Sequence, residues 1–179
     1  MESGTMPKSW LDTMAEREAK LDVLTRPQRI WEAFAIVIIF LIASYFIYSQ
    51  VHDTGFFTSA FGPTEEIAFY GSLFFGIVPP LARMIVGKRN AVRPLDIVGA
   101  IVFIVAASYL LGVWPFNFDY FAAALPQSLQ FLFDWLDNDL AMLLIEIGIF
   151  ISAIVAVWTV FQYIVIRNKL NEGRVKPTQ

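Results

Sequence analysis

LAMLLIEIGIFISAIVAVWTVFQYIVI, at residues 140–166, is a long apolar stretch with a single charged side chain, Glu146. An α-helix rises 1.5 Å per residue, so this stretch is long enough to cross the hydrocarbon core of a bilayer with room for tilt. Gly148, Ser152 and Ala156 recur at every fourth position, and this spacing lets two membrane helices approach closely. The stretch therefore predicts a membrane-spanning helix with a helix-packing face.

Three further apolar stretches precede it, at residues 30–50, 67–86 and 95–114. The chain has 179 residues, of which 57% are hydrophobic, so four spans leave little sequence for a soluble domain. Trp31 lies at the start of the first stretch, where membrane interfaces favour aromatic side chains, and Glu32 suits the positive end of a helix. We therefore predict an all-α integral membrane protein with four transmembrane helices in a bundle.

All 13 lysine and arginine residues fall on one side of the predicted membrane. They are Lys8, Arg17, Lys20, Arg26 and Arg29 before the first span, Arg83, Lys88, Arg89 and Arg93 between the second and third, and Arg167, Lys169, Arg174 and Lys176 after the fourth. Cytoplasmic loops carry an excess of these residues, so we predict a cell-membrane protein with both termini in the cytoplasm. The predicted organisation is a cytoplasmic arm of residues 1–29, a membrane domain of residues 30–166 and a basic cytoplasmic tail of residues 167–179.

SWLDTMAEREAKLDVLTRPQR, at residues 9–29, predicts an amphipathic helix that ends at Pro27. Ser9 with Asp12 three residues later fits a capping box at its start. One interpretation is a helix that lies on the cytoplasmic surface of the membrane. The other is a helix that docks onto a partner protein.

A second amphipathic segment lies between the third and fourth spans. Leu129, Leu132, Phe133 and Leu136 follow the spacing of one helix face, and Pro126 lies near its start. We therefore predict a short helix at the far membrane interface, on the side that carries no lysine or arginine.

Glu146 is the one acidic residue well inside a span. A carboxylate at that depth is costly, and such residues are candidate functional sites by default. Since no lysine or arginine lies on the far side, Glu146 must be protonated, hydrogen-bonded, hydrated or paired with another subunit. Gly148 follows Glu146 by two positions, and each position turns an α-helix by 100°. Glu146 and Gly148 therefore point in nearly opposite directions. A partner subunit would satisfy both faces, and a carboxyl group that serves only packing is the alternative.

Pro79-Pro80 interrupts the second span, because two prolines remove two backbone donors. In lipid, the carbonyl groups left without donors need side chains, water or an ion. We interpret the pair as a kink, with Arg83 extending to the headgroups; an ion-binding break like those of transporters is the alternative. Asp96, expected in the first turn of the third span, is interpreted as the partner of Arg93 or Arg83, with a proton relay as the alternative.

Signatures of catalysis and of cofactor binding are absent from the sequence. There is no cysteine, which excludes disulfides, thiolate metal sites and cysteine nucleophiles. The single histidine, His52, excludes a bis-histidine haem held by this chain alone. Neither an HExxH nor a GxSxG motif occurs, so an integral membrane enzyme is disfavoured. We predict no catalytic residue, no cofactor and no metal site.

These observations favour a non-catalytic accessory subunit of a larger membrane complex. The predicted partners are the lipid bilayer and other membrane subunits or further copies of the chain, and no nucleic acid. The alternative is a small transport or channel subunit that uses Glu146 and the Pro79-Pro80 break.

The layout of the chain resembles that of the small membrane subunit of TRAP-type solute transporters. The shared features are a horizontal N-terminal helix, four spans, both termini in the cytoplasm and an acidic pair, here Glu65-Glu66, that opens the second span. The resemblance covers the layout of the whole chain and implies a role in transport. The loop of residues 51–64 is longer than the corresponding loop expected from that layout.

Overall fold

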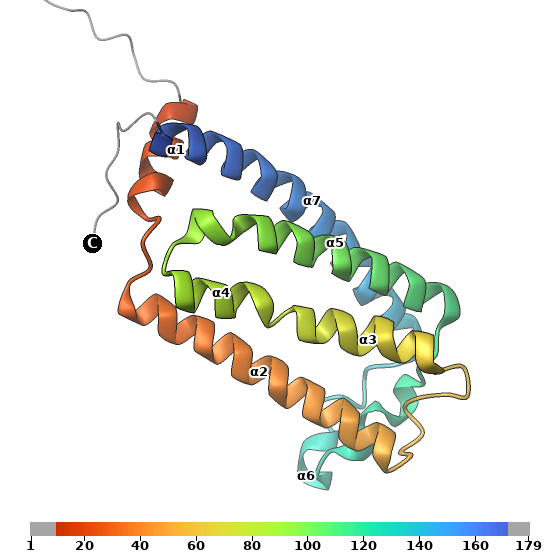
Figure 1. Ribbon diagram of the computed structural model, residues 1–179. Helices are drawn as coiled ribbons and strands as arrows, with labels where there is room; N and C mark the ends of the chain where they lie inside the picture. Colours follow the sequence, from red (N-terminus) through yellow and green to blue (C-terminus); the bar gives the residue numbers. More distant parts are fainter. Residues whose placement is uncertain (1–9, 172–179) are drawn as a thin grey trace, which may run out of the picture.

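The computed structural model describes residues 10–171, and in that part of the chain every regular element is a helix (Figure 1). The predicted cap at Ser9 and the tail beyond Asn171 lie outside the described residues. The helices are α1 (Trp10–Lys20), α2 (Arg26–Val51), α3 (Pro63–Phe75), α4 (Val78–Val86), α5 (Arg89–Val113), the 3₁₀ helix η1 (Phe118–Ala124), α6 (Gln127–Gln130) and α7 (Asn138–Asn171).

Four helical segments are long and apolar enough to cross a membrane, which confirms the predicted number of spans. They are Arg26–Val51, Pro63–Val86, Arg89–Val113 and Asn138–Asn168, with mean hydropathies of 2.3, 1.5, 2.2 and 2.7. Each helix begins before its predicted apolar stretch, because polar residues such as those at the start of α2 and α5 continue the helix beyond the apolar region. The protein is therefore a multi-pass helical membrane protein.

The four spans form an open row, whereas a four-helix bundle was predicted from the sequence. α7 packs along α5, α5 packs against α3 and α4, and α2 packs against α4 and α3. Among the described residues, the backbone of α2 approaches neither α5 nor α7. Figure 1 accordingly shows α2 and α7 at opposite edges of the molecule. In a closed four-helix bundle the first and last helices would be neighbours.

The most extensive helix contact joins α5 and α7. A Cβ atom built on Gly148 would stand 3.7 Å from Cζ of Phe103, so the glycine faces α5 in ordinary van der Waals contact. Ser152 and Ala156 continue the same stripe of α7 and are half-buried. Ala106 of α5 is buried as well. Small side chains on both helices allow the two backbones to lie close together.

One end of the row, which we call the aromatic end, is closed by a cluster of rings. Phe56 and Phe116 are buried at its centre and stack with centroids 5.5 Å apart. The connection between α2 and α3 is tied to the one after α5, because Thr58 donates to the carbonyl of Pro115 (2.9 Å) and Asn117 donates to that of Phe56 (2.7 Å). The surrounding rings are Phe46, Phe57, Phe61, Phe69, Trp114, Phe118 and Phe121.

The predicted helix over Leu129–Leu136 is mostly wrong. Only Gln127–Gln130 is α-helical, and residues 131–135 form turns. The backbone bonds in this segment span three residues, from Leu132 to Leu129 and from Leu136 to Phe133, so the chain keeps a tighter winding than an α-helix. Its apolar side chains still follow the predicted spacing, but the i→i+4 bonds are missing.

The N-terminal helix is shorter than predicted, because α1 ends at Lys20 and does not continue to Pro27. Thr25 is the N-cap of α2, and its N–H donates to Oε1 of Gln28 (2.9 Å). Pro27 lies in the first turn of α2, where its fixed φ and missing N–H suit a helix start. The proline therefore begins a span, whereas it was expected to end the arm.

We expect Gly148→Leu to lower the stability of the protein, because its side chain would separate α7 from Phe103 and the rest of α5. Ile147→Leu is the matched control, since Ile147 is exposed on α7. Thermal unfolding in a mild detergent measures the difference, and a loss of about 1–3 kcal/mol is expected for Gly148→Leu alone. Equal effects of the two substitutions would contradict this account of the α5–α7 contact.

Candidate functional site

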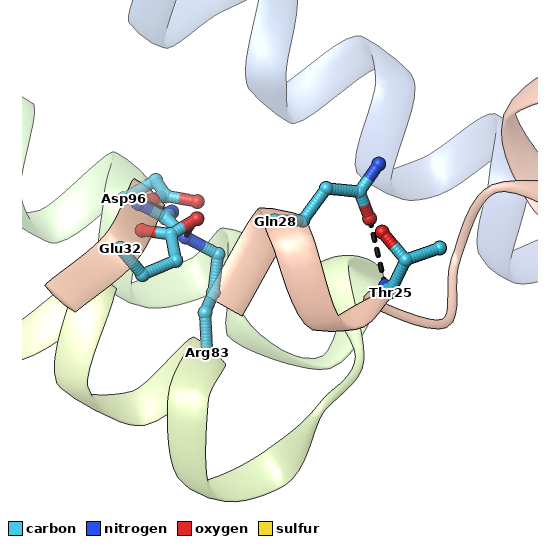
Figure 2. A network of polar contacts seen from close by, with 5 residues as sticks. All are labelled: Thr25, Gln28, Glu32, Arg83 and Asp96. Atoms are coloured by element: carbon cyan, nitrogen blue, oxygen red, sulfur yellow. Dashed lines mark hydrogen bonds and ion pairs between the residues drawn. The ribbon is translucent and has the colours of Figure 1, made fainter. Parts of the chain in front are cut away.

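Three charged side chains from three helices meet between α2, α4 and α5 (Figure 2). Nε of Arg83 donates to Oε1 of Glu32 (2.8 Å), and Nη1 donates to Oδ1 of Asp96 (2.5 Å). The three side chains are 22%, 19% and 30% exposed, respectively. One guanidinium thus joins two carboxylates from other helices, and we call this group the Arg83 ion triple.

Local sequence brings Arg83 to this position. Pro79 and Pro80 occupy the first turn of α4, where they lack only donors that a helix start leaves free, and Arg83 follows in the next turn. Gly87 ends α4 with φ +69°, and a Cβ atom there would collide with the guanidinium of Arg29. The glycine thereby permits the turn into α5, which carries Asp96 back alongside α4.

The Arg83 ion triple stabilises the row only as a unit. Removing one member of a buried pair leaves an uncompensated charge, which costs about 3–5 kcal/mol in soluble proteins. Here the charges are partly exposed, so the lower end of that range applies. Because α2 packs mainly on α4 and α3, the bond from Arg83 to Glu32 ties an edge helix to the rest of the row.

Two sequence-based interpretations of this region are wrong. Arg83 does not extend away from the protein to headgroups, because Glu32 and Asp96 hold its guanidinium. Asp96 does not lie in the first turn of its span, because α5 begins at Arg89. Of the two partners suggested for Asp96, the structure selects Arg83, while Arg93 binds elsewhere.

Arg93 fastens the N-terminal arm to α5. Its Nη2 donates to Oε2 of Glu18 in α1 (3.2 Å), and its Nη1 lies 3.5 Å from Oδ1 of Asn90. Ala15 and Ala19 of α1 are fully buried. Since α1 packs against α7 as well, the arm bridges α5 and α7 at one end of the row.

The segment after α1 is bound to the turn between α4 and α5 by its backbone. The N–H of Asn90 donates to Oδ1 of Asp22 (2.6 Å), and the N–H of Arg89 donates to the carbonyl of Asp22 (2.8 Å). The N–H of Leu24 donates to the carbonyl of Gly87 (2.9 Å). Asp22 is 5% exposed, so these bonds lie in a protected position. The described part of the arm, from Trp10 onward, is therefore part of the folded domain.

Pro79 and Pro80 divide the second span into α3 and α4, as expected from the sequence. The carbonyl groups of Phe75 and Gly76 would bond to the N–H groups four residues later, which the two prolines lack. Within residues 10–171, neither carbonyl accepts a backbone hydrogen bond outside the regular helical ladders, whereas Ile77 donates to the carbonyl of Phe74 (3.0 Å). Both prolines are buried, whereas Gly76, which lies at the break itself, is exposed.

Glu146 lies on α7 with its side chain exposed. None of the hydrogen bonds or ion pairs of the described residues includes its carboxyl group. Gly148 faces Phe103 on the opposite side of the helix, as the angle between the two positions predicts. The structure does not bring Glu146 together with Arg83, Asp96 or the proline pair.

Glu65, near the aromatic end, takes part in local bonds. Glu65 accepts hydrogen bonds from the N–H of Gly62 (2.9 Å) and from the hydroxyl of Tyr109 (2.5 Å), and so caps α3 and joins it to α5. His52 stacks on Tyr48 with ring centroids 3.9 Å apart. Within residues 10–171, no three histidine, aspartate or glutamate side chains lie close enough to hold a metal ion.

Sequence reasoning missed Glu32 as a partner of Arg83 and assigned it only a helix-end role. The sequence did carry a signal for this contact. Glu32, Arg83 and Asp96 lie near the ends of three successive spans, and these ends must meet on the same side of the membrane. Glu18 and Asp22 were also missed, since their partners lie on α5, far along the chain.

We expect Arg83→Leu to destabilise the protein by about 3 kcal/mol, because Glu32 and Asp96 would lose their shared partner. Lys88→Leu removes an exposed cation nearby and is the control. The triple variant Arg83→Leu, Glu32→Leu and Asp96→Leu should recover most of the loss, because it removes the uncompensated charges too. Thermal unfolding in detergent gives the comparison; equal stability of Arg83→Leu and Lys88→Leu would contradict it.

Residues 10–171 thus present the Arg83 ion triple inside the row, a fastened α1, an interrupted span and the isolated acid Glu146 on an apolar surface. Comparison with protein-family models, with curated proteins and with solved structures gave no match.

Proposed function

We propose that this chain is a non-catalytic membrane subunit that packs against partner chains of a larger membrane complex. The observation that carries the proposal is the exposed carboxyl group of Glu146 on a span of mean hydropathy 2.7. Hydrocarbon offers that group neither a hydrogen bond nor a counter-charge. A second membrane chain with a donor or a cation at the same depth would supply both.

The residues around Glu146 support a helix as that partner. Leu143, Phe150 and Val157 are 50%, 68% and 73% exposed, and Ala153 is exposed as well. Together with Glu146 they alternate spacings of three and four residues, which is the repeat of a coiled-coil seam. One polar residue in such a seam selects the register and the partner at some cost in stability. We call this surface the Glu146 seam.

The Glu146 seam continues into a shallow apolar groove beside the arm. The groove is lined by Trp10 of α1 together with Ala153, Ile154, Val157, Trp158 and Phe161 of α7. Only 6% of the most apolar window of α7 is buried within this chain. The seam and the groove therefore offer a partner helix a continuous surface along α7.

A small transport or channel subunit is the second candidate function. The interrupted second span favours it, because carbonyl groups left free by prolines are used to hold ions in transporters. Under this proposal Glu146 would exchange protons or bind a cation during flux. The layout that resembles the small subunit of TRAP-type transporters belongs to this candidate.

We further propose that both termini lie in the cytoplasm and that the protein resides in the cell membrane. The start of α2, the turn before α5 and the last turns of α7 carry the basic residues Arg26, Lys88 and Arg167. Figure 1 places these segments, together with α1, at the same end of the row. The positive-inside rule assigns that end to the cytoplasm. There, Trp10, at 68% exposure, would lie in the membrane interface.

Substitution of Glu146 tests the subunit proposal. In the native membrane, a photo-crosslinking amino acid at Phe150 should form an adduct with a membrane protein, and Glu146→Leu should reduce that adduct at least tenfold. Glu146→Gln should reduce it only slightly, because the amide keeps the size and much of the hydrogen bonding. The same amino acid at Val155, which is exposed but lies off the seam, is the control.

Two outcomes would argue against the role proposed for Glu146. If neither Glu146 variant changes the adduct, Glu146 does not hold a partner. If both variants leave the adduct intact but abolish pH-dependent ion flux in liposomes that contain the purified complex, the transport proposal is supported.

Single cysteines test the orientation, because the natural chain has none. We expect Ser59→Cys, in the exposed loop between α2 and α3, to react with an impermeant maleimide added to intact cells. Lys88→Cys, in the exposed turn between α4 and α5, should react only after the membrane is opened. The reverse pattern would invert the proposed orientation.

A further inference from the structure

A cavity of about 330 Å³ lies between residues from all four spans. Its walls include Ile39 of α2, Leu73 and Gly76 at the end of α3, Phe103 of α5 and Ile145 of α7. Buried side chains close it toward the aromatic end, namely Ala107, Leu110 and Phe116. Gly76 and Phe103 are exposed, so the cavity opens on that side to the surroundings of the spans.

Small residues keep this space open. Ser72, Gly76 and Ala107 stand where larger side chains would fill it. The hydroxyl of Ser72 donates to the carbonyl of Phe69 (2.9 Å), so the wall offers little unpaired polarity. An apolar cavity of this kind excludes water and accepts hydrocarbon.

We propose that this cavity binds the hydrocarbon chain of a membrane lipid or fatty acid. The volume selects this occupant. A helix 10 Å across already needs roughly 420 Å³ for one turn, which is more than the cavity holds. An apolar cavity of 150 Å³ accepts benzene, so 330 Å³ accommodates roughly twelve carbon atoms of a chain.

The position of the cavity agrees with this occupant. It lies along spans whose outer surfaces meet lipid, and its mouth at Gly76 and Phe103 lies on the spans. A chain in the cavity would contact α2, α3, α5 and α7 at once, although the backbone of α2 touches neither α5 nor α7. The lipid would therefore join the two edges of the open row. This inference is independent of the partner proposed for Glu146.

A fatty acid that carries a diazirine near its middle tests the proposal on the full-length purified protein in detergent. We expect saturable labelling of peptides that contain Leu73 and Ala107, and unlabelled palmitate should compete with it. Ala107→Phe should reduce this labelling at least fivefold, because the ring fills the cavity. Val105→Phe adds the same ring on the exposed side of α5 and should leave the labelling unchanged.

Ser72→Leu fills the same cavity from α3 and should reduce the labelling in the same way, which guards against a folding defect in Ala107→Phe. The proposal is overturned if labelling is not saturable and spreads equally over exposed residues such as Val37 and Ile151. It is also overturned if unlabelled palmitate does not compete with the labelling of the peptides that contain Leu73 and Ala107.

Discussion

The guanidinium of Arg83 is the point at which three of the four spans are joined by charge. Its bonds to Glu32 and Asp96 connect α2, α4 and α5 without any contact between the backbones of α2 and α5. Burial of apolar side chains does little to select which helices become neighbours in lipid, because lipid is equally apolar. A charge that must be compensated is directional, and it therefore fixes which helices are neighbours at this end of the row.

Glu32 and Asp96, the two acids that meet Arg83, contrast with Glu146, which does not. Glu32 and Asp96 are satisfied within the chain, whereas Glu146 stands alone on the far side of α7 from Gly148. An open row leaves the edge helices α2 and α7 with 6% of their apolar windows buried. The same architecture thus produces an internally complete ion triple and an edge that, in our proposal, a second chain completes.

The wrong predictions share a cause in tertiary contacts that override local signals. Pro27 resembles a helix terminator. However, α1 ends earlier, where Asp22 bonds to Arg89 and Asn90 at the start of α5, and Pro27 then lies in the first turn of α2. The spacing of Leu129 and Leu136 fits an α-helix, yet this connection winds more tightly while it closes the aromatic end.

The sequence by itself determined the number of spans, because the transfer of an apolar helix into lipid depends only on its own residues. It also determined that Glu146 and Gly148 lie on opposite faces, because 100° per residue is a property of the helix alone. Only the tertiary structure decided that Arg83 meets both Glu32 and Asp96, that Arg93 holds the arm through Glu18, and that the spans form an open row. These features depend on which helices, far apart in the chain, pack side by side. Lipid is as apolar as the helices, so a few charges and small residues determine the neighbours, and the sequence of a single span does not reveal them.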